Sequence, residues 1–186
     1  DFASGSQQTL SAWVMHESLQ GDYWGWLAKD DGSSANWIAY FQASTADMEY
    51  FNNSGSEIGC GVGLAVTALW YYVTISFNDS TNVVTCYVDG ALVGSPSNTT
   101  AFAANAAQVT IGSSRNTVDP YDGIIDEVRI SNNIRTSFWV ATEYRNQLLP
   151  NSFYSYSGEE VETRSSAVAG VKVRGGTKIR GGVKFR

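Results

Sequence analysis

The chain has little charge, little histidine and little cysteine, and these shortages exclude several classes of protein. Only 16% of its 186 residues are charged while 13% are aromatic, which excludes a disordered chain and a coiled coil. Its single histidine, His16, rules out most histidine-based triads and multi-histidine zinc sites. No stretch reaches the roughly 18 consecutive apolar residues of a membrane span. The chain also begins without a methionine or an apolar leader, so we expect a processed product or a fragment.

The residues that are abundant indicate an all-β protein. Glycine, serine, threonine and asparagine are frequent, and short apolar and aromatic runs recur every 8–12 residues or so between turn clusters. The strongest run, residues 70–78, faces residues 83–89 across Asp79-Ser80-Thr81-Asn82, which predicts a hairpin. Asp89-Gly90 predicts the next turn. The pattern predicts a two-sheet antiparallel β-sandwich or jelly roll.

One segment near the end of the sandwich has helical rather than strand periodicity. Over residues 134–148, before Pro150, six apolar side chains can share one face: Ile134, Phe138, Val140, Ala141, Tyr144 and Leu148. We therefore predict one short helix that packs on the rim of the sandwich. We expect the domain to span residues 1–157, followed by a polar linker over 158–168 and a separate tail over 169–186.

The tail carries a basic repeat of period six, and the charge of the chain is divided accordingly. Residues 1–166 hold all 18 acidic side chains and 6 basic ones, a net charge of −12, whereas the tail adds +6. In an extended strand its side chains alternate between an apolar side (Val171, Val173, Thr177, Ile179, Val183, Phe185) and a basic side (Lys172, Arg174, Lys178, Arg180, Lys184, Arg186). Such a strand needs a sheet edge. We expect it to dock on an acidic neighbouring copy, building a filament or ring, or to pack on its own domain. Nucleic acid is not an expected partner, because phosphate would repel the acidic body.

Several motifs in a fixed order resemble a known family. They are Trp70-Tyr71-Tyr72-Val73, Asn78-Asp79-Ser80, Cys86-Tyr87-Val88-Asp89-Gly90, Val109-Thr110-Ile111-Gly112 and Asp122-Gly123-Ile124-Ile125-Asp126-Glu127-Val128-Arg129-Ile130-Ser131. Arg135, Trp139, Ala141, Tyr144 and Asn146-Gln147 match the segment that closes such domains. Over about residues 8–156 the chain resembles the laminin-G-like domains of the concanavalin A-like lectin/glucanase superfamily. The resemblance implies an antiparallel jelly roll, secretion or display at a cell or particle surface, and binding of glycans or proteins.

The same resemblance raises the questions of a sheet edge and of calcium. Relatives usually have a further strand or two before residues 8–17, so if Asp1 is the true start we expect a sheet to lack an edge strand and to leave unpaired backbone groups or an open groove. In the Asp126-Glu127-Val128-Arg129 motif, alternation turns Asp126 toward the core, where we expect the motif to secure a loop backbone. Relatives hold Ca²⁺ at the sandwich rim, and no cofactor is required otherwise. The candidate oxygen ligands are Asp30, Asp31, Asp119 and Asp122.

Nothing in the sequence matches a catalytic motif of the glucanases in this superfamily. Those enzymes carry three acidic residues at alternating positions of one strand. Asp47-x-Glu49 lacks the third member, and Glu159-Glu160-x-Glu162 lies in the predicted linker. We therefore predict a protein that is not an enzyme.

The aromatic residues of the first half could form a platform for sugar rings or simply fill the core. Tyr23 and Trp37, beside turns, are the best candidates for the surface. Cys60 and Cys86 could pair or remain two buried thiols. Three candidate glycosylation sequons begin at Asn52, Asn78 and Asn98.

Two functions remain open at this point. The first is a non-catalytic extracellular structural or adhesive protein that self-assembles through its tail. The second is a glycan-binding module, with or without calcium, whose tail is a linker or an anchor.

Overall fold

The computed structural model describes residues 7–30, 37–52, 56–97, 106–115 and 118–153. These residues belong to one compact unit, Asp1–Phe153. The predicted linker (158–168) and the predicted tail (169–186) lie outside the described residues.

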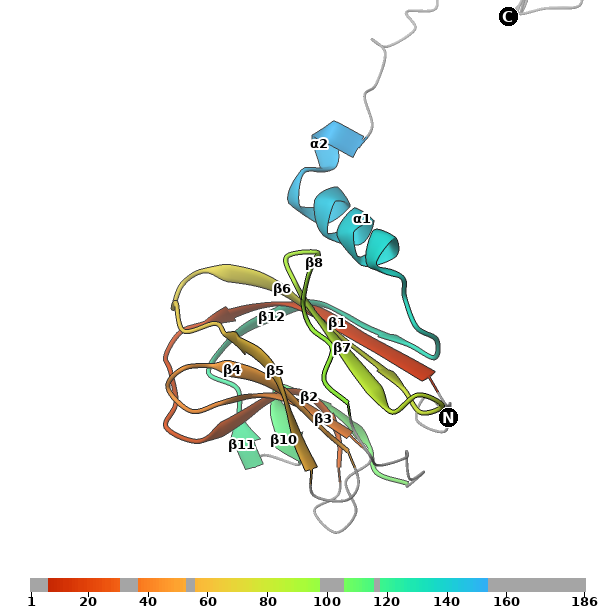
Figure 1. Ribbon diagram of the computed structural model, residues 1–186. Helices are drawn as coiled ribbons and strands as arrows, with labels where there is room; N and C mark the ends of the chain where they lie inside the picture. Colours follow the sequence, from red (N-terminus) through yellow and green to blue (C-terminus); the bar gives the residue numbers. More distant parts are fainter. Residues whose placement is uncertain (1–6, 31–36, 53–55, 98–105, 116–117, 154–186) are drawn as a thin grey trace, which may run out of the picture. The chain divides into compact units, whose positions relative to one another are not determined.

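Two five-stranded antiparallel sheets form the body (Figure 1). Sheet A has the order β12 (Gly123–Ser131), β1 (Gln7–His16), β6 (Trp70–Asn78), β7 (Val83–Val88) and β8 (Ala91–Gly94). Sheet B has the order β5 (Ser56–Gly63), β4 (Asp47–Asn52), β3 (Trp37–Gln42), β2 (Tyr23–Lys29) and β9 (Val109–Ile111). A hairpin of β10 (Ser113–Arg115) and β11 (Val118–Pro120) lies beside β2. The predicted antiparallel sandwich is confirmed, including the hairpin of β6 and β7.

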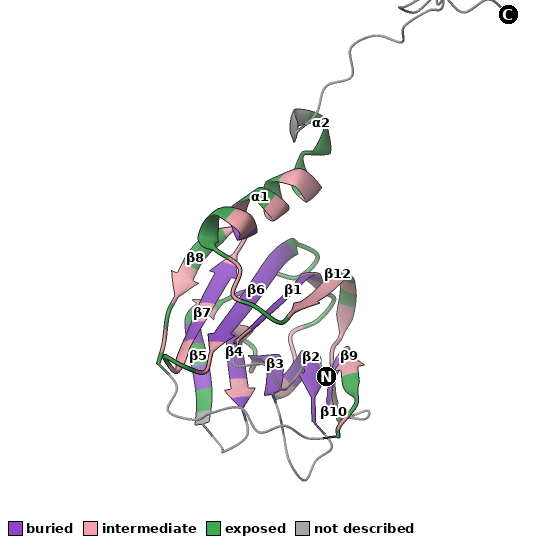
Figure 2. Ribbon diagram, turned by 90° about the vertical axis from the view of Figure 1, so that its right-hand side faces the viewer, coloured by how far each residue is buried: buried purple, intermediate pink, exposed green. Residues whose placement is uncertain are grey.

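The core lies between the two sheets and is rich in large rings. Side chains that alternate along each strand point inward, and those that are completely buried include Leu10, Val14, Trp24, Trp26, Trp37, Phe41, Met48 and Tyr50. Figure 2 shows β1, β6 and the central strands of sheet B as mostly buried, and β12 as more exposed. Burying these side chains, of which each aromatic one removes about 150–250 Å² from water, supplies the main driving force for folding.

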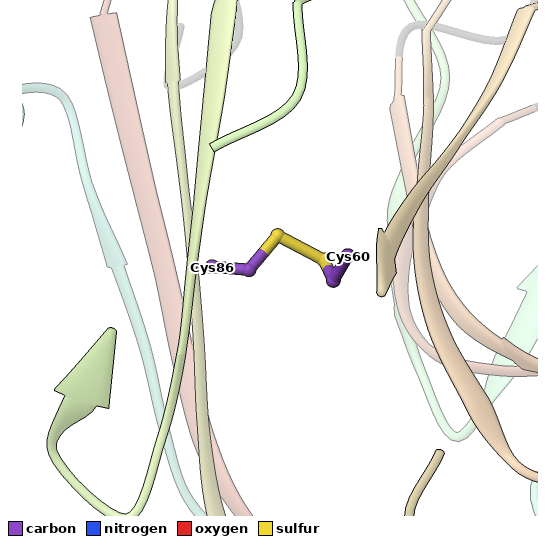
Figure 3. The surroundings of a disulfide bond; sticks show 2 residues. All are labelled: Cys60 and Cys86. Carbon is purple, nitrogen blue, oxygen red and sulfur yellow. A yellow bond between two sulfur atoms is a disulfide. The ribbon is translucent and has the colours of Figure 1, made fainter. Parts of the chain in front are cut away.

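A disulfide between Cys60 and Cys86 joins the two sheets (Figure 3). Cys60 lies on the edge strand β5 of sheet B, and Cys86 lies on β7 of sheet A. Their Cα atoms are 5.8 Å apart across the interior. Of the two states that the sequence left open, the structure therefore contains the bonded one. The backbones are close here, because a Cβ on Gly94 would come within 2.3 Å of the Cys60 carbonyl oxygen.

The predicted helix is present as α1 (Ser137–Leu148), followed by a short turn of helix, α2 (Pro150–Phe153). Thr136 caps α1, and its hydroxyl accepts a hydrogen bond of 3.3 Å from the Trp139 backbone N–H. The predicted apolar face is only partly correct. Val140 is the buried residue of α1, whereas Phe138 is 85% exposed and Leu148 is also exposed. Within the described residues, neither helix has the length and apolar character needed to cross a membrane.

Helix α1 lies over the outer face of sheet A (Figure 1). Val140 packs against Tyr72 and Tyr87 of that sheet. The tight turn between β7 and β8 makes this contact possible, because Asp89 and Gly90 both have positive φ and a Cβ on Gly90 would lie 3.0 Å from the Ala141 Cα atom. The Asp89-Gly90 turn is thus confirmed, and α1 packs directly against it.

Strand β1 lies inside sheet A, because it pairs with β6 on one side and with β12 on the other. One expectation about the neighbouring strand β12 is wrong. Asp126 does not face the core. A β-bulge lies where β12 pairs with Ser11–Trp13, and Glu127 there has a positive φ of 52°, so the alternation shifts by one residue. As a result Ile125 and Val128 pack against the core while Asp126 is exposed.

Candidate functional site

The outer face of sheet B carries a second cluster of aromatic and polar side chains, separate from the core. Because Trp37, Ala39 and Phe41 of β3 point inward, Ile38 and Tyr40 point outward. The same alternation turns Glu49 outward on β4 and Glu57 outward on β5, opposite the core residues Met48 and Ile58. We call Tyr23, Tyr40, Gln42, Glu49 and Glu57 the tyrosine face.

Hydrogen bonds and a ring contact join the side chains of the tyrosine face, from the buried floor (Tyr40 and Glu49) to the more accessible rim (Tyr23, Gln42 and Glu57). The Tyr40 hydroxyl donates to Glu49 Oε2 over 2.6 Å. The rings of Tyr23 and Tyr40 meet edge to face, with centroids 5.5 Å apart. Gln42 Nε2 donates to the Tyr23 hydroxyl over 3.2 Å, and the Glu57 carboxylate also hydrogen-bonds this phenol. Side chains from four neighbouring strands are therefore held in fixed positions.

The two deepest groups of this face have raised pKa values. Burial raises the pKa of Glu49, the charges of Glu57 and Asp47 raise it further, and the hydrogen bond from Tyr40 partly opposes them. Burial also raises the pKa of Tyr40, as do its hydrogen bond to Glu49 and the charge of that carboxylate. Both groups are nearly covered, with exposures of 3% for Tyr40 and 8% for Glu49. They form a rigid floor.

The rim of the face is accessible. Tyr23 and Gln42 are half-buried and Glu57 is exposed. For Tyr23, the hydrogen bond from Gln42 lowers the phenol pKa, but the hydrogen bond to Glu57 and its charge outweigh this and raise it. Beside Glu49, the glycines of β5 leave open space: a Cβ on Gly59 would still be 3.8 Å from Glu49 Oε1, and one on Gly61 would meet nothing within 4 Å. The rim therefore offers a ring, an amide and a carboxylate to a ligand.

Of the two aromatic residues predicted at the surface, only Tyr23 is there. Trp37 is completely buried, because it is the first residue of β3 and its position in the alternation directs it into the core. The prediction that Trp37 binds a glycan is therefore wrong. The aromatic neighbour of Tyr23 on the outer face is Tyr40, whose side chain is itself nearly covered.

Three of the four predicted calcium ligands lie among the described residues, and these three do not form a metal-binding group. Asp30 is buried at the end of β2, whereas Asp119 lies on β11 and Asp122 accepts a hydrogen bond from the Ser18 hydroxyl just before β12. Asp31 lies outside the described residues. Within the part of the chain that the structure describes, no three His, Cys, Asp or Glu side chains form a group that could hold a metal ion.

The candidate glycosylation sites differ in accessibility. Asn52 is completely buried on β4, where it pairs with Trp37, so its use as a glycosylation site in the folded protein is excluded. Asn78 is half-buried, and its side-chain oxygen accepts hydrogen bonds from the Ser80 backbone N–H and hydroxyl. Asn98 lies outside the described residues.

Arg129 of the predicted structural motif holds α1 in place rather than a loop. Its guanidinium lies 2.5 Å from Glu127 Oε2 and 2.9 Å from Glu143 Oε1 on α1. Asp126, by contrast, accepts the backbone N–H of its neighbour Glu127. The motif thus links β12 to the helix.

Sequence reasoning missed Tyr40, Gln42, Glu49 and Glu57 as site residues. The signal that could have identified them is the alternation of side chains along each strand. Once Trp37 and Tyr50 are assigned to the core, the residues next to them on β3 and β4, and every second residue from there, must face outward. The acidic pair Asp47-x-Glu49 lacks a third member on its own strand, but the structure adds Glu57 from β5.

Comparisons with known proteins agree with this geometry. The family model described as the concanavalin A-like lectin/glucanases superfamily matches residues 1–141. Comparison with curated protein sequences gives no match.

Three solved structures show the same fold at low sequence identity. A candidate carbohydrate-binding protein from Bacteroides ovatus has a TM-score of 0.59 and 18% identity, covering 73% of this chain and 40% of its own. A sialidase from Trypanosoma rangeli has a TM-score of 0.58 and 18% identity, covering 80% of this chain and 24% of its own. A heptameric SAP-like pentraxin from Limulus polyphemus has a TM-score of 0.61 and 15% identity, covering 75% of this chain and 70% of its own.

The chain spans less than half of the first two of these proteins. The matched family model covers about three quarters of the chain, and the sandwich has the architecture of that family. The chain therefore belongs to the concanavalin A-like lectin/glucanase superfamily, as a laminin-G-like domain.

Proposed function

We propose that this protein is a non-catalytic carbohydrate-binding module, and that the tyrosine face is its glycan site. The observation that carries the proposal is the set of three different groups at an accessible rim above a rigid floor: the Tyr23 ring, the Gln42 amide and the Glu57 carboxylate. Sugar hydroxyls both donate and accept hydrogen bonds, so an amide beside a carboxylate suits them. An aromatic ring offers an apolar surface to the C–H groups of a pyranose.

The charge of the face indicates which glycans it accepts. Asp47, Glu49 and Glu57 point outward on neighbouring strands, and residues 1–166 carry a net charge of −12. An anionic ligand would meet like charge. We therefore expect neutral oligosaccharides to bind, and sulfated or uronic-acid glycans to bind less.

Replacement of Tyr23 tests this site. We expect Tyr23→Ala to weaken the binding of a neutral oligosaccharide at least tenfold, because it removes both the ring and the hydroxyl that holds Gln42. Tyr23→Phe keeps the ring, so its loss should be smaller. The measurement is a glycan array with the wild type, followed by calorimetric titration of the best neutral ligand with each variant.

The matched control for this experiment is Phe138→Ala, which removes an exposed ring from α1 and should leave the affinity unchanged. Binding of Tyr23→Ala as tight as that of the wild type, or an array on which no neutral glycan binds, would contradict the proposal.

The absence of catalysis is part of the same proposal. A glycosidase needs two carboxyl groups that reach the scissile bond. Glu49 is covered and its Oε2 atom accepts the Tyr40 hydroxyl, which supports a structural role for it. Incubation of the bound oligosaccharide with the protein should release no reducing ends.

We also propose that the protein works outside the cell or at its surface, without requiring calcium. The disulfide supports this location, because such bonds persist in oxidising compartments. We expect no requirement for calcium, because Asp30, Asp119 and Asp122 form no metal-binding group within the described residues, so binding should survive a chelator.

Self-assembly through residues 169–186 stays a prediction from the sequence repeat. If the tail adds as a strand to a neighbouring copy, light scattering should show large particles for the full chain and a monomer for a chain that ends at Ser166. Particles of the same size for both chains would contradict assembly through the tail, and would leave the glycan site unaffected.

A further inference from the structure

The outer face of sheet B continues from the tyrosine face onto the edge strand β5, which is rich in glycine. Ile58 and Cys60 belong to the core, so Gly59 between them points outward, and Gly61 and Gly63 follow at every second position. Glycine weakens the interior of a strand, because it loses more conformational freedom on folding than other residues and has no side chain to pack. Three glycines so placed on one strand need a reason.

The fold itself requires two of these glycines but not the third. A Cβ on Gly63 would lie 2.8 Å from the Thr45 carbonyl oxygen, and Gly61 has a positive φ of 73°. Gly59 has no positive φ, and among the described residues a Cβ there would meet only Glu49 Oε1, at an ordinary contact distance of 3.8 Å. The strand would therefore accept a side chain at Gly59. A strand glycine that the fold does not require marks a place where a ligand can approach the backbone closely.

A carboxylate oxygen borders the open space over Gly59. Glu49 is 8% exposed, and its Oε2 atom accepts the Tyr40 hydroxyl over 2.6 Å. Among the described residues no side chain donates to Oε1, the oxygen on the side of Gly59. A largely covered acceptor without a donor is costly. Because Gly59 is exposed and carries no side chain, a hydroxyl group of a ligand can reach this oxygen from solvent.

We propose that one ring of the bound glycan lies directly on the backbone of β5 at Gly59, and that a hydroxyl group of this ring donates a hydrogen bond to Glu49 Oε1. This inference rests on the proposed function and extends the glycan site from Tyr23 to the edge of sheet B.

The distance between the two positions defines the class of ligand. Tyr23 lies on β2 and Gly59 lies on β5, with β3 and β4 between them, so the two positions are three strand spacings apart, or about 14 Å. A single sugar ring reaches only one of them. The ligand that fills both is an oligosaccharide of several rings rather than a monosaccharide.

Gly59→Val is the diagnostic variant. Valine favours a strand and its Cβ fits, so the melting temperature should equal or exceed that of the wild type. Its methyl groups fill the space over the backbone, so the affinity for the best neutral oligosaccharide of the glycan array should fall at least tenfold in a calorimetric titration of the full chain. Gly59→Ala should show a smaller loss in the same direction.

The matched control is Ala91→Val, which places the same side chain at an exposed position of β8, an edge strand of the other sheet. It should bind as the wild type does. A clearly lower melting temperature of Gly59→Val would show that the fold needs this glycine, and it would overturn the inference.

Glu49→Gln tests the hydrogen bond. It keeps an oxygen for the Tyr40 hydroxyl and replaces only Oε1 by a donor, so the affinity should fall at least threefold. Unchanged affinity would overturn the role of Glu49 as an acceptor.

Tyr23→Ala separates this inference from the proposed function. Weaker binding by Tyr23→Ala together with wild-type binding by Gly59→Val would keep the glycan site and overturn only its extension to β5. Wild-type binding by both variants would overturn the glycan site as well. Weaker binding by both variants is the result we expect.

Discussion

Replacing both Cys60 and Cys86 with alanine lowers the free energy of unfolding by about 3–4 kcal/mol. The two residues are 26 positions apart, and a cross-link that closes a loop of this length removes that much entropy from the unfolded chain. Both side chains are buried in the core, so the lost sulfur atoms add a smaller packing cost. The bond is also the only disulfide in the part of the chain described, and it joins the two sheets.

Urea unfolding at pH 7 measures this effect. The wild type with a reductant is the matched control, and its midpoint should move to that of the double variant, whereas the reductant should not affect the variant. A loss below 1 kcal/mol would show that the two sheets are held by their side-chain packing alone.

Acidification from pH 7 to pH 5 destabilises the protein by roughly 1–2 kcal/mol through His16. This side chain is completely buried between the rings of Trp24, Phe41, Tyr71 and Tyr121, and burial lowers its pKa from 6.5 to about 4. Between pH 6.5 and pH 4 His16 is protonated in the unfolded chain but stays neutral in the folded chain. The free energy of unfolding therefore falls as the pH falls through this range. One pKa unit corresponds to about 1.4 kcal/mol.

The variant His16→Gln separates titration from packing. Glutamine retains a polar atom for the Tyr121 hydroxyl, which lies 2.8 Å from His16 Nδ1, but it does not titrate. The variant should be less stable at pH 7 and show a flatter profile of unfolding free energy between pH 7 and pH 5. Because the chain has one histidine, an equally steep profile in the variant would show that His16 is not the cause.

The architecture was predictable where local patterns determine it. Residues 70–78 and 83–89 are two runs rich in apolar, aromatic and β-branched side chains that a polar turn joins, so their hairpin follows from the chain itself. The disulfide was not predictable, because whether β5 and β7 meet depends on how the two sheets pack. Asp126 was misplaced because a bulge shifts the alternation, and a bulge leaves no clear mark in the sequence.

The candidate site was harder to predict, because it depends on which residues of each strand face inward. Trp37 and Tyr40 are both aromatic and lie on the same strand, yet one fills the core and the other faces outward. Composition does not distinguish them. Glu49 and Glu57 are brought together only by the pairing of β4 with β5.

The measurement that tests the glycan site most directly is an NMR titration of the ¹⁵N-labelled full chain with its best neutral oligosaccharide. The account predicts that the largest shift changes cluster at Tyr23, Gln42 and Glu57, on the outer face of sheet B. Changes confined to α1 and β12, or to the β10–β11 hairpin, would contradict it and place the glycan elsewhere on the sandwich.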